Sequence, residues 1–381
     1  MNILISAGEV SGDLHAAAIA RELKKIDSDI QIFGMGGEEL RKAGGEVLFD
    51  IKEHSVMGFI EVIKRLPKLF KLKADFGKLM DERKPDCFIT IDYPGFNMKL
   101  AKMAHAKNIP VVCFIPPGAW AWHRSRAKAV AKFATKVACI FPFEYDVYKE
   151  AGADTEFVGH PLVDIVHPSM GAEQACEFAG KRQGHPLVLI MPGSRLMEIE
   201  KMLDTLLAGA KILQEKHPEI DLAMPRATTI PKELLLNKIK KYGLDIRITE
   251  GNNYDLFSVA DLALATSGTV TLEAAILGLG SVIVYRTSWL NAFIARLVLN
   301  IPFIGLPNIV AGRQVLPELL QENFTAEKVA AATEELLELE RNKVMKNDLA
   351  FVRQKLGDSG AVRRVAELVL RVAKSKNNRG L

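Results

Sequence analysis

Polar and charged side chains follow several apolar stretches of this 381-residue chain, at points where a strand pattern gives way to a helix pattern. The clearest case is 187–200, where five apolar residues lead into a Pro-Gly turn that includes Gly193, followed by Ser194 and Arg195. Such a turn leaves backbone N–H groups at the positive end of a helix dipole, which favours anions. We expect Ser194 to cap the helix and Arg195 to bind a diphosphate. An ordinary turn with a surface arginine is the alternative.

A second turn of the same kind follows the apolar stretch 262–265 and contains Ser267, Gly268 and Thr269. We expect their hydroxyl and N–H groups to bind phosphate. Glu273 lies in the next helix pattern, among apolar residues, where a carboxylate without a partner is unusual. It is placed to accept hydrogen bonds from ribose hydroxyls, and a purely structural partner is the alternative.

Asp92 ends the apolar stretch 87–91, immediately before a turn that Pro94 imposes. A carboxylate at the end of a buried strand can act as a general base, with a pKa that depends on its burial. We therefore predict Asp92 as a catalytic base. Its alternative role is a turn or helix cap.

The loop after the first strand pattern carries Glu9, Ser11 and Asp13. It lacks the Gly-x-Gly-x-x-Gly spacing of dinucleotide sites, and its carboxylates would repel a pyrophosphate. Sugar hydroxyl groups suit an acidic loop better, so we expect these residues to bind a sugar acceptor. Alternatively, Ser11 or Asp13 caps the following helix.

Two tryptophans, Trp120 and Trp122, lie in a proline-containing loop after the strand pattern 110–115. Large aromatic rings in such a loop favour a ligand surface over core packing alone. We group them, together with Met57, among the residues expected to contact the acceptor.

Residues 54–84 combine apolar side chains with clustered Lys and Arg, and Pro67 is expected to break this run in the middle. The combination is typical of an element that rests on anionic lipid or holds acyl chains. A helix packed on the sheet with its basic face in water is the alternative. The side chains expected to contact membrane or acyl chains are Phe59, Ile63, Leu66, Leu69 and Phe70.

These residues need strands and helices that bring them together. Strand patterns alternate with helix patterns in both halves of the chain, which predicts two parallel, doubly wound sheets of the α/β class. Ligands of such sheets bind outside the carboxyl ends of the strands, and two halves can enclose a cleft. The expected strands are 2–6, 30–35, 46–49, 87–91, 110–115 and 137–141, then 187–191, 220–224, 245–249, 262–265 and 281–285.

Composition excludes several classes of protein. Hydrophobic residues at 49% and charged residues at 25% are ordinary for a globular protein, and a net charge of +4 is weak support for nucleic-acid binding. The four cysteines show no Cys-x-x-Cys pair, which suits a reducing cytosol. The histidines show no zinc-ligand spacing. The first residues form a strand pattern rather than a basic leader, and no apolar run approaches the roughly 18 residues of a spanning helix.

Taken in order, a set of short motifs resembles the lipid-A-disaccharide synthase family. Each motif is short, but the set is specific and covers most of the chain. The motifs are Ala7–Asp13, Asp92–Asn97, Trp120–Trp122, Pro142–Glu144, Gly159–His160, Pro192–Arg195, Ser267–Thr269 with Glu273, Leu306–Asn308 and Gly312–Arg313.

The resemblance implies a GT-B glycosyltransferase, in which two Rossmann-like domains face a central cleft. It places the acceptor on residues 1–165 and the nucleotide on residues 166–345. The helical tail 346–381 either returns to the first domain or packs on a second subunit of a homodimer, and the sequence leaves both alternatives open. Asn308 and Arg313, which match the family's motif, are expected to contact UDP.

The resemblance also implies a reaction and its partners. UDP-2,3-diacylglucosamine and 2,3-diacylglucosamine 1-phosphate are joined through a β-1,6 bond, and UDP is released. Combining both lines of reasoning, Asp92 deprotonates the acceptor hydroxyl and Arg195 offsets the charge on the leaving UDP. We expect no cofactor, no metal and no nucleic acid. A cytoplasmic protein held peripherally at the inner membrane of a Gram-negative bacterium is expected.

Two departures from the family's pattern are visible. Some members carry a second Asp where this chain has Gly95, and Pro116-Pro117 differ from the expected Ser-Pro. Two other functions remain as alternatives. A UDP-N-acetylglucosamine 2-epimerase would share the diphosphate turns and Glu273 but would have no use for the basic apolar stretch. A non-catalytic lipid- or nucleotide-binding protein would bind nucleotide without needing Asp92.

Overall fold

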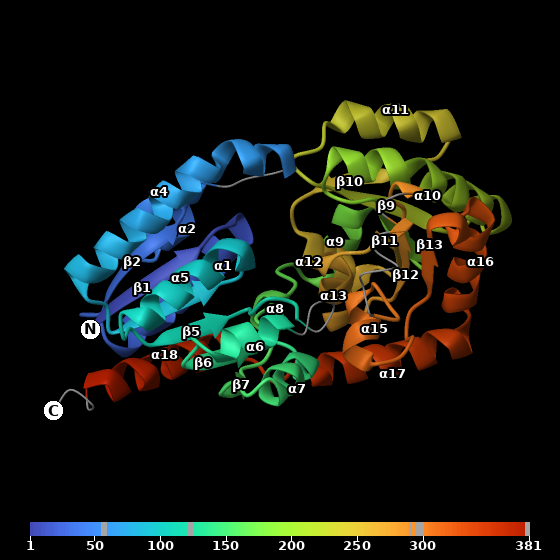
Figure 1. Cartoon of the computed structure of the whole chain (residues 1–381). Helices are drawn as coiled ribbons and strands as arrows, with labels where there is room; N and C mark the ends of the chain where they lie inside the picture. Colours follow the sequence, from blue (N-terminus) through green and yellow to red (C-terminus); the bar gives the residue numbers. More distant parts are fainter. Residues whose placement is uncertain (55–58, 120–124, 290–291, 294–300, 378–381) are drawn as a thin grey trace. The chain divides into compact units, whose positions relative to one another are not determined.

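The computed structural model describes residues 1–54, 59–119, 125–289, 292–293 and 301–377, without the side chains at 54, 59–66 and 376–377. The chain forms two compact units (Figure 1). The first contains Met1–Pro161 together with Gly357–Leu381, and the second contains Leu162–Leu356.

Within the described part of the first unit, seven parallel strands form one sheet in the order β3-β2-β1-β4-β5-β6-β7. From β1 outward, β2 and β3 follow on one side and β4 to β7 on the other, as in doubly wound folds. The strands are β1 (Asn2–Ala7), β2 (Gln31–Gly36), β3 (Glu46–Asp50), β4 (Cys87–Ile91), β5 (Val111–Phe114), β6 (Lys136–Cys139) and β7 (Thr155–Phe157).

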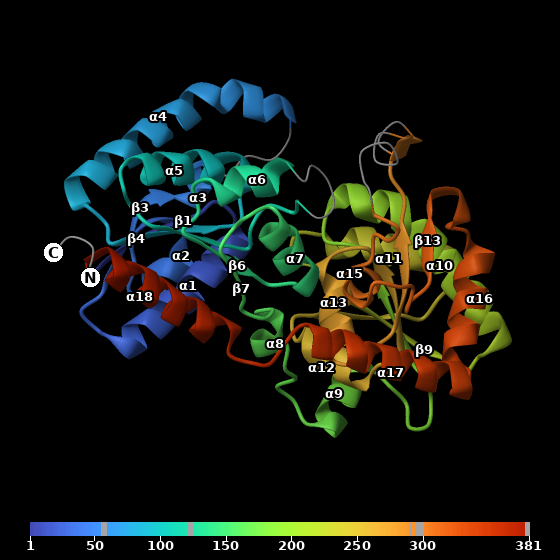
Figure 2. The ribbon, with the colours of Figure 1, turned by 60° about the horizontal axis from the view of Figure 1, so that its bottom comes forward.

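Helices cover both faces of this sheet (Figure 2). α4 and α5 supply buried side chains such as Phe76 and Leu100 to one face, and α1, α2 and α18 lie on the other. The helices of this unit are α1 (Val10–Ile26), α2 (Glu38–Lys42), α3 (Ile51–His54), α4 (Phe59–Arg83), α5 (Pro94–Ala106), α6 (Ser125–Ala131), α7 (Pro142–Glu150) and α18 (Ala361–Asn377).

The described part of the second unit holds a six-stranded parallel sheet in the order β10-β9-β8-β11-β12-β13. All five residues of β8 are buried, as expected for a strand covered on both faces. The strands are β8 (Leu187–Met191), β9 (Asp221–Arg226), β10 (Arg247–Glu250), β11 (Leu262–Thr266), β12 (Ser281–Tyr285) and β13 (Glu318–Leu320).

Helices of the second unit also pack on both faces of their sheet. α10 and α16 contact each other and β11 on one face, while α9, α12 and α13 bury apolar side chains against the other. The remaining bounds are α8 (Leu162–Ile165), α9 (Ala172–Ala179), α10 (Leu196–Lys216), α11 (Lys232–Tyr242), α12 (Asn253–Val259), α13 (Thr269–Ile276), α15 (Leu306–Ala311), η1 (Gln321–Asn323), α16 (Ala326–Leu337) and α17 (Leu339–Lys355).

The expected break at Pro67 is wrong, because α4 continues through this proline. A proline inside a helix removes one hydrogen bond and costs roughly 3 kcal/mol. The second half of α4 buries Leu72, Phe76 and Met80 against the sheet. That burial is large enough to offset the local cost.

The expected helical tail, 346–381, is divided between the two units instead of forming one segment. α17 buries Met345, Leu349 and Val352 within the second unit, and the chain enters the first unit again at Gly357. α18 then packs beside α1 (Figure 2). Gly357 has a φ of +83°, and a Cβ there would lie 3.3 Å from the Cα of Gly159. The return therefore depends on a residue without a side chain.

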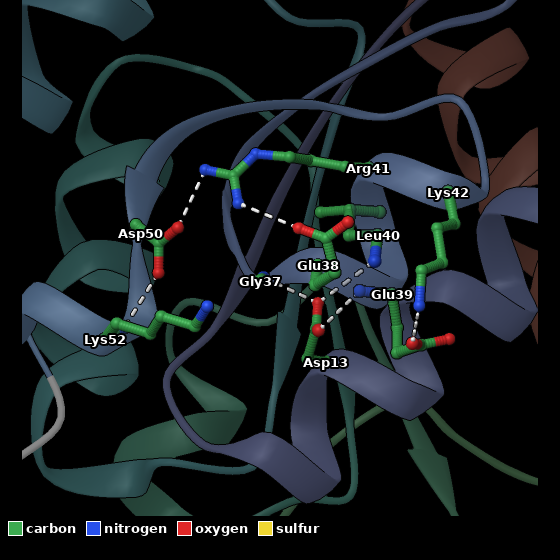
Figure 3. Close-up of polar contacts among 9 residues, drawn as sticks. All are labelled: Asp13, Gly37, Glu38, Glu39, Leu40, Arg41, Lys42, Asp50 and Lys52. Atoms are coloured by element: carbon green, nitrogen blue, oxygen red, sulfur yellow. Dashed lines mark hydrogen bonds and ion pairs between the residues drawn. The ribbon is translucent and has the colours of Figure 1, made fainter.

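Asp13 holds α1 and α2 together in the first unit (Figure 3). Its Oδ1 accepts hydrogen bonds from the backbone N–H groups of Gly37 at 2.6 Å and Leu40 at 3.2 Å, and its Oδ2 accepts one from Glu39 at 3.0 Å. The side chain is only 4% exposed. A Cβ on Gly37 would lie 2.7 Å from Oδ2, so glycine permits this approach. Asp13 is thus a long-range cap of α2.

Replacing Asp13 tests this role. Asp13→Ala leaves three backbone donors at the start of α2 without their acceptor, and should lower the free energy of unfolding by about 1–3 kcal/mol. Urea denaturation followed by circular dichroism measures the change. Asp29→Ala, in an exposed turn, serves as the control and should change the value by less than about 0.5 kcal/mol. An unchanged unfolding midpoint for Asp13→Ala would contradict the capping role.

Candidate active site

The second unit contains a cavity of about 400 Å³ at the carboxyl edge of its sheet. Two turns line it, one between β8 and α10 and the other between β11 and α13. It brings together seven of the nine residues predicted to bind nucleotide: Gly193, Ser194, Arg195, Ser267, Gly268, Thr269 and Glu273.

In the first turn, the residue that caps α10 is not the Ser194 predicted from the sequence. The N-cap residue of α10 is Arg195, one position after Ser194. Glu198, in the first turn of the helix, is the capping side chain: its Oε2 accepts hydrogen bonds from the backbone N–H groups of Ser194 at 2.9 Å and Arg195 at 3.2 Å. Gly193 has a φ of +117°, and a Cβ there would lie 2.5 Å from Oε2 of Glu198. A carboxylate of the protein therefore occupies part of the predicted anion site.

Glu198 also orients Arg195, because its Oε1 accepts a hydrogen bond from Nη1 of Arg195 at 2.9 Å. The Arg195 side chain is 77% exposed. Among the described residues, this carboxylate is the hydrogen-bond partner of the guanidinium, so its other N–H groups can bind a ligand. Sequence reasoning missed Glu198, although an acidic residue at the third position of a helix is a recognised capping signal.

The N-cap residue of α13 in the second turn is Gly268, which has no side chain with which to cap the helix. The hydroxyl of Ser267 donates to the carbonyl oxygen of Ile304 at 3.0 Å, so its proton is not available to phosphate as predicted. Backbone N–H groups are what this turn offers an anion. Arg226, at the end of β9, also lines the cavity and adds a positive charge that the sequence did not suggest.

Glu273 lies in the second turn of α13 and lines the same cavity. Burial raises the pKa of its carboxyl group, and a hydrogen bond with the side chain of Tyr254 partly offsets this rise. The carboxylate thus has a structural partner and also faces the cavity.

In the first unit, Asp92 follows β4 in a turn with unusual backbone angles. Asp92 has a φ of 47° and Tyr93 a φ of 50°, and both values are uncommon outside glycine. Asn97 holds the turn in place: its Nδ2 donates to the carbonyl oxygen of Asp92 at 2.7 Å and to that of Ser6 at 3.1 Å. Such local strain persists only where the surroundings enforce it, and it is common at functional sites.

The carboxyl group of Asp92 is half-buried. Burial raises its pKa, and the N–H of Tyr93 partly opposes the shift. A carboxylate with a raised pKa binds a proton more readily, which is what a general base requires.

The first-loop residues that were predicted to bind the acceptor sugar fall into two groups. Glu9 and Ser11 are exposed at the start of α1. Burial and then the Glu9 carboxylate raise the pKa of Tyr93, which places Glu9 near the Asp92 turn. The structure gives Asp13 a structural role instead, because its oxygens are occupied by the start of α2. The predicted sugar contact from Asp13 is therefore not supported.

The structure also gives structural roles to the two remaining residues of the predicted nucleotide set. Asn308 is fully buried, with Nδ2 donating to Glu318 at 2.7 Å and Oδ1 accepting from the N–H groups of Val315 and Leu316 at 2.8 Å. Arg313 forms a two-point ion pair with Asp348. Neither residue lines the cavity.

Several predicted contacts fall where the structure gives no side-chain position. Met57, Trp120 and Trp122 lie outside the described residues, and Phe59, Ile63 and Leu66 are described only as backbone of α4. Two predicted membrane residues can be placed. Leu69 is partly buried against the core of the first unit, and Phe70 is 65% exposed.

Comparison with known proteins identifies the family. The family model described as "Lipid-A-disaccharide synthetase" matches residues 3–370. The chain belongs to the lipid-A-disaccharide synthase family. The lipid-A-disaccharide synthase of Geobacter sulfurreducens is 37% identical over 372 residues, covering 97% of this chain and 96% of the relative. That of Myxococcus xanthus is 37% identical over 369 residues, with 97% and 96% coverage. The protein is therefore a glycosyltransferase of lipid A biosynthesis.

Solved structures agree on the fold. UDP-GlcNAc 2-epimerase from Neisseria meningitidis, bound to UDP-GlcNAc, has a TM-score of 0.64 at 12% identity, covering 97% of this chain and all of that one. A glycosyltransferase from Rickettsia africae has a TM-score of 0.59 at 13% identity, with 98% of both chains covered. Family membership and these neighbours establish the GT-B fold, as the sequence predicted.

The described residues contain no group of three or more His, Cys, Asp or Glu side chains arranged to hold a metal ion. None of their helices is both long and apolar enough to cross a bilayer.

The raised pKa of Asp92 has a consequence for stability. Because the folded state binds this proton more tightly than the unfolded chain, stability falls as the pH rises through the raised pKa. Asp92→Asn should therefore raise the melting temperature at neutral pH, and the gain should shrink as the pH approaches the usual aspartate range. Thermal melts across pH measure it, with exposed Asp81→Asn as the control. A melting temperature lowered at neutral pH would contradict the predicted penalty.

The placement of Arg313 predicts a negative result. Since Arg313 pairs with Asp348 away from the cavity, Arg313→Ala should leave UDP affinity unchanged while slightly lowering the melting temperature. Isothermal titration calorimetry with UDP measures the affinity, and Arg195→Ala provides the comparison in which affinity should fall. Weaker UDP binding by Arg313→Ala would restore the role that the sequence first suggested.

Proposed function

We propose that this protein transfers 2,3-diacylglucosamine from its UDP derivative to 2,3-diacylglucosamine 1-phosphate, forming a β-1,6-linked disaccharide 1-phosphate and UDP. The main support is the cavity of the second unit, where two strand-to-helix turns and Glu273 surround one space at the carboxyl edge of a parallel sheet. Backbone N–H groups and a guanidinium suit a diphosphate, and a carboxylate suits ribose hydroxyls.

The donor nucleotide is bound in this cavity. Its diphosphate contacts the start of α13 and those N–H groups of Arg195 that Glu198 does not engage. As the bond between the sugar and the diphosphate breaks, negative charge grows on the leaving UDP. Arg195 stabilises that charge by hydrogen bonding, the role that a divalent metal has in other transferases.

The acceptor is activated by the first unit. Asp92 removes the proton from the 6-hydroxyl of the acceptor, whose oxygen attacks the anomeric carbon of the donor sugar from the face opposite the diphosphate. The carbon–oxygen bond to UDP breaks in the same step, so an α-linked donor yields a β-glycoside. The raised pKa of Asp92 supports this assignment, because the proton it takes is held more firmly.

We also propose that the protein acts at the inner face of the cytoplasmic membrane. Phe70 is exposed on α4 between the exposed Lys68 and Lys71. An apolar ring flanked by cations suits the boundary of an anionic bilayer.

A mass-spectrometric assay tests the proposed reaction. The purified protein is incubated with UDP-2,3-diacylglucosamine and 2,3-diacylglucosamine 1-phosphate in the presence of EDTA, and the expected products are a disaccharide monophosphate and UDP. Asp92→Asn should lower kcat by about 10²–10⁴-fold and Arg195→Ala by about 10²–10³-fold, without loss of folding.

Matched controls are Asp81→Asn and Arg313→Ala, which change the same residue types away from the proposed site. Both should retain wild-type turnover. Full activity of Asp92→Asn would remove Asp92 as the base. Loss of product in EDTA would show that a metal takes part. Epimerisation of UDP-N-acetylglucosamine without disaccharide formation would replace the proposal with an isomerase.

A further inference from the structure

Tyr254 interacts with Glu273 and is not among the residues that line the donor cavity. It is in the first turn of α12, and its hydroxyl group is hydrogen-bonded to the Glu273 carboxylate from the neighbouring helix. Glu273 and Phe257 line the cavity, whereas Tyr254 does not. The rings of Tyr254 and Phe257 meet edge to face with centroids 6.2 Å apart. Tyr254 is thus held by packing at one end and by a hydrogen bond at the other.

The direction of this hydrogen bond follows from the two groups. Burial, followed by the charge of Glu273, raises the pKa of Tyr254 to about 12, so the phenol keeps its proton at neutral pH and donates it. A carboxylate has two oxygens with several acceptor positions. Because Tyr254 occupies one of these positions, the others can accept hydrogen bonds from a ligand in the cavity.

We propose that Tyr254 is a positioning residue for ribose recognition, which orients the Glu273 carboxylate so that it accepts hydrogen bonds from the ribose hydroxyl groups of the donor nucleotide. This inference rests on the proposed function, which places UDP in the cavity. It adds a specific role for a residue that touches neither the substrate nor the reacting atoms.

The surroundings of Glu273 explain why a partner is needed. α13 is apolar around it, with Leu272, Ala274 and Ala275 buried, and burial disfavours the charged form of a carboxyl group. The hydroxyl of Tyr254 favours that form. The other charged groups lining the cavity are engaged in pairs with each other or with a neighbour: Arg195 with Glu198, and Arg226 with Glu250. Among the described residues, the Tyr254 hydroxyl is therefore the interaction that favours the charged form of Glu273.

Nucleotide binding tests this proposal. Isothermal titration calorimetry compares UDP with 2′-deoxy-UDP, which lacks one of the hydroxyl groups to be recognised. The wild type should prefer UDP. Tyr254→Phe, which removes only the hydroxyl, should weaken UDP binding by about tenfold and 2′-deoxy-UDP binding much less, because the lost contact is to ribose. In this variant, UDP affinity should also fall more steeply as the pH is lowered, since Glu273 protonates more easily.

Glu273→Gln provides the reference. It should lose most of the preference for UDP, and adding Tyr254→Phe to it should cause little further loss, because Tyr254 acts through Glu273. Thermal melting checks that each variant is folded.

Three outcomes would overturn the inference. Equal loss of both nucleotides in Tyr254→Phe would show a packing role only. Wild-type preference and affinity in that variant would show no role. A full preference for UDP in Glu273→Gln would mean that this carboxylate does not read the ribose. None of these three binding outcomes decides whether the disaccharide assay gives product. Failure of the inference can therefore be distinguished from failure of the proposed function.

Discussion

A strand-to-helix turn leaves backbone N–H groups without partners. In both units of this chain, side chains accept hydrogen bonds from many of these groups. Carboxylates within helices do much of this work. Asp13 accepts from three N–H groups at the start of α2, Glu198 from two before α10, Glu144 from two before α7, and Asp255 from those of Ser169 and Met170. The N-cap residue of α13 is Gly268, which has no side chain with which to cap the helix. The backbone N–H groups at this helix start line the same cavity as Arg195, and together they favour an anion.

The same chemistry separates structural from functional residues. Asp13 and Asn308 have oxygens filled by backbone donors and are almost or fully buried, so they have nothing left for a ligand. Glu273 is partly buried with one donor from Tyr254, and it still faces a cavity. Asp92 keeps a raised pKa in a strained turn. It is unfavourable to keep a buried group charged or a backbone turn strained. Such features are therefore expected where they contribute to function.

Much of the fold was predictable from local pattern. Apolar runs buried on both faces predict parallel strands, and every expected strand is present within two residues at either end. The short strands β7 and β13 were not predicted, because three half-buried residues carry no periodic signal. Pro67 misled the prediction because tertiary burial outweighs a local helix cost. Tyr254 and Arg226 were missed because their importance depends on neighbours distant in sequence. Glu198 was missed although its partners, Ser194 and Arg195, lie only three or four residues away.

The sequence by itself determined the fold class, the turns that line the cavity of the second unit, and the family, since these depend on residues close together along the chain. Only the tertiary structure decided how each polar side chain is used. Whether a carboxylate caps a helix, pairs with an arginine or faces a cavity depends on which backbone donors lie within about 3 Å of it. For Asp13 those donors belong to α2, an element that begins more than twenty residues further along the chain. Chain order does not specify such distances; packing does.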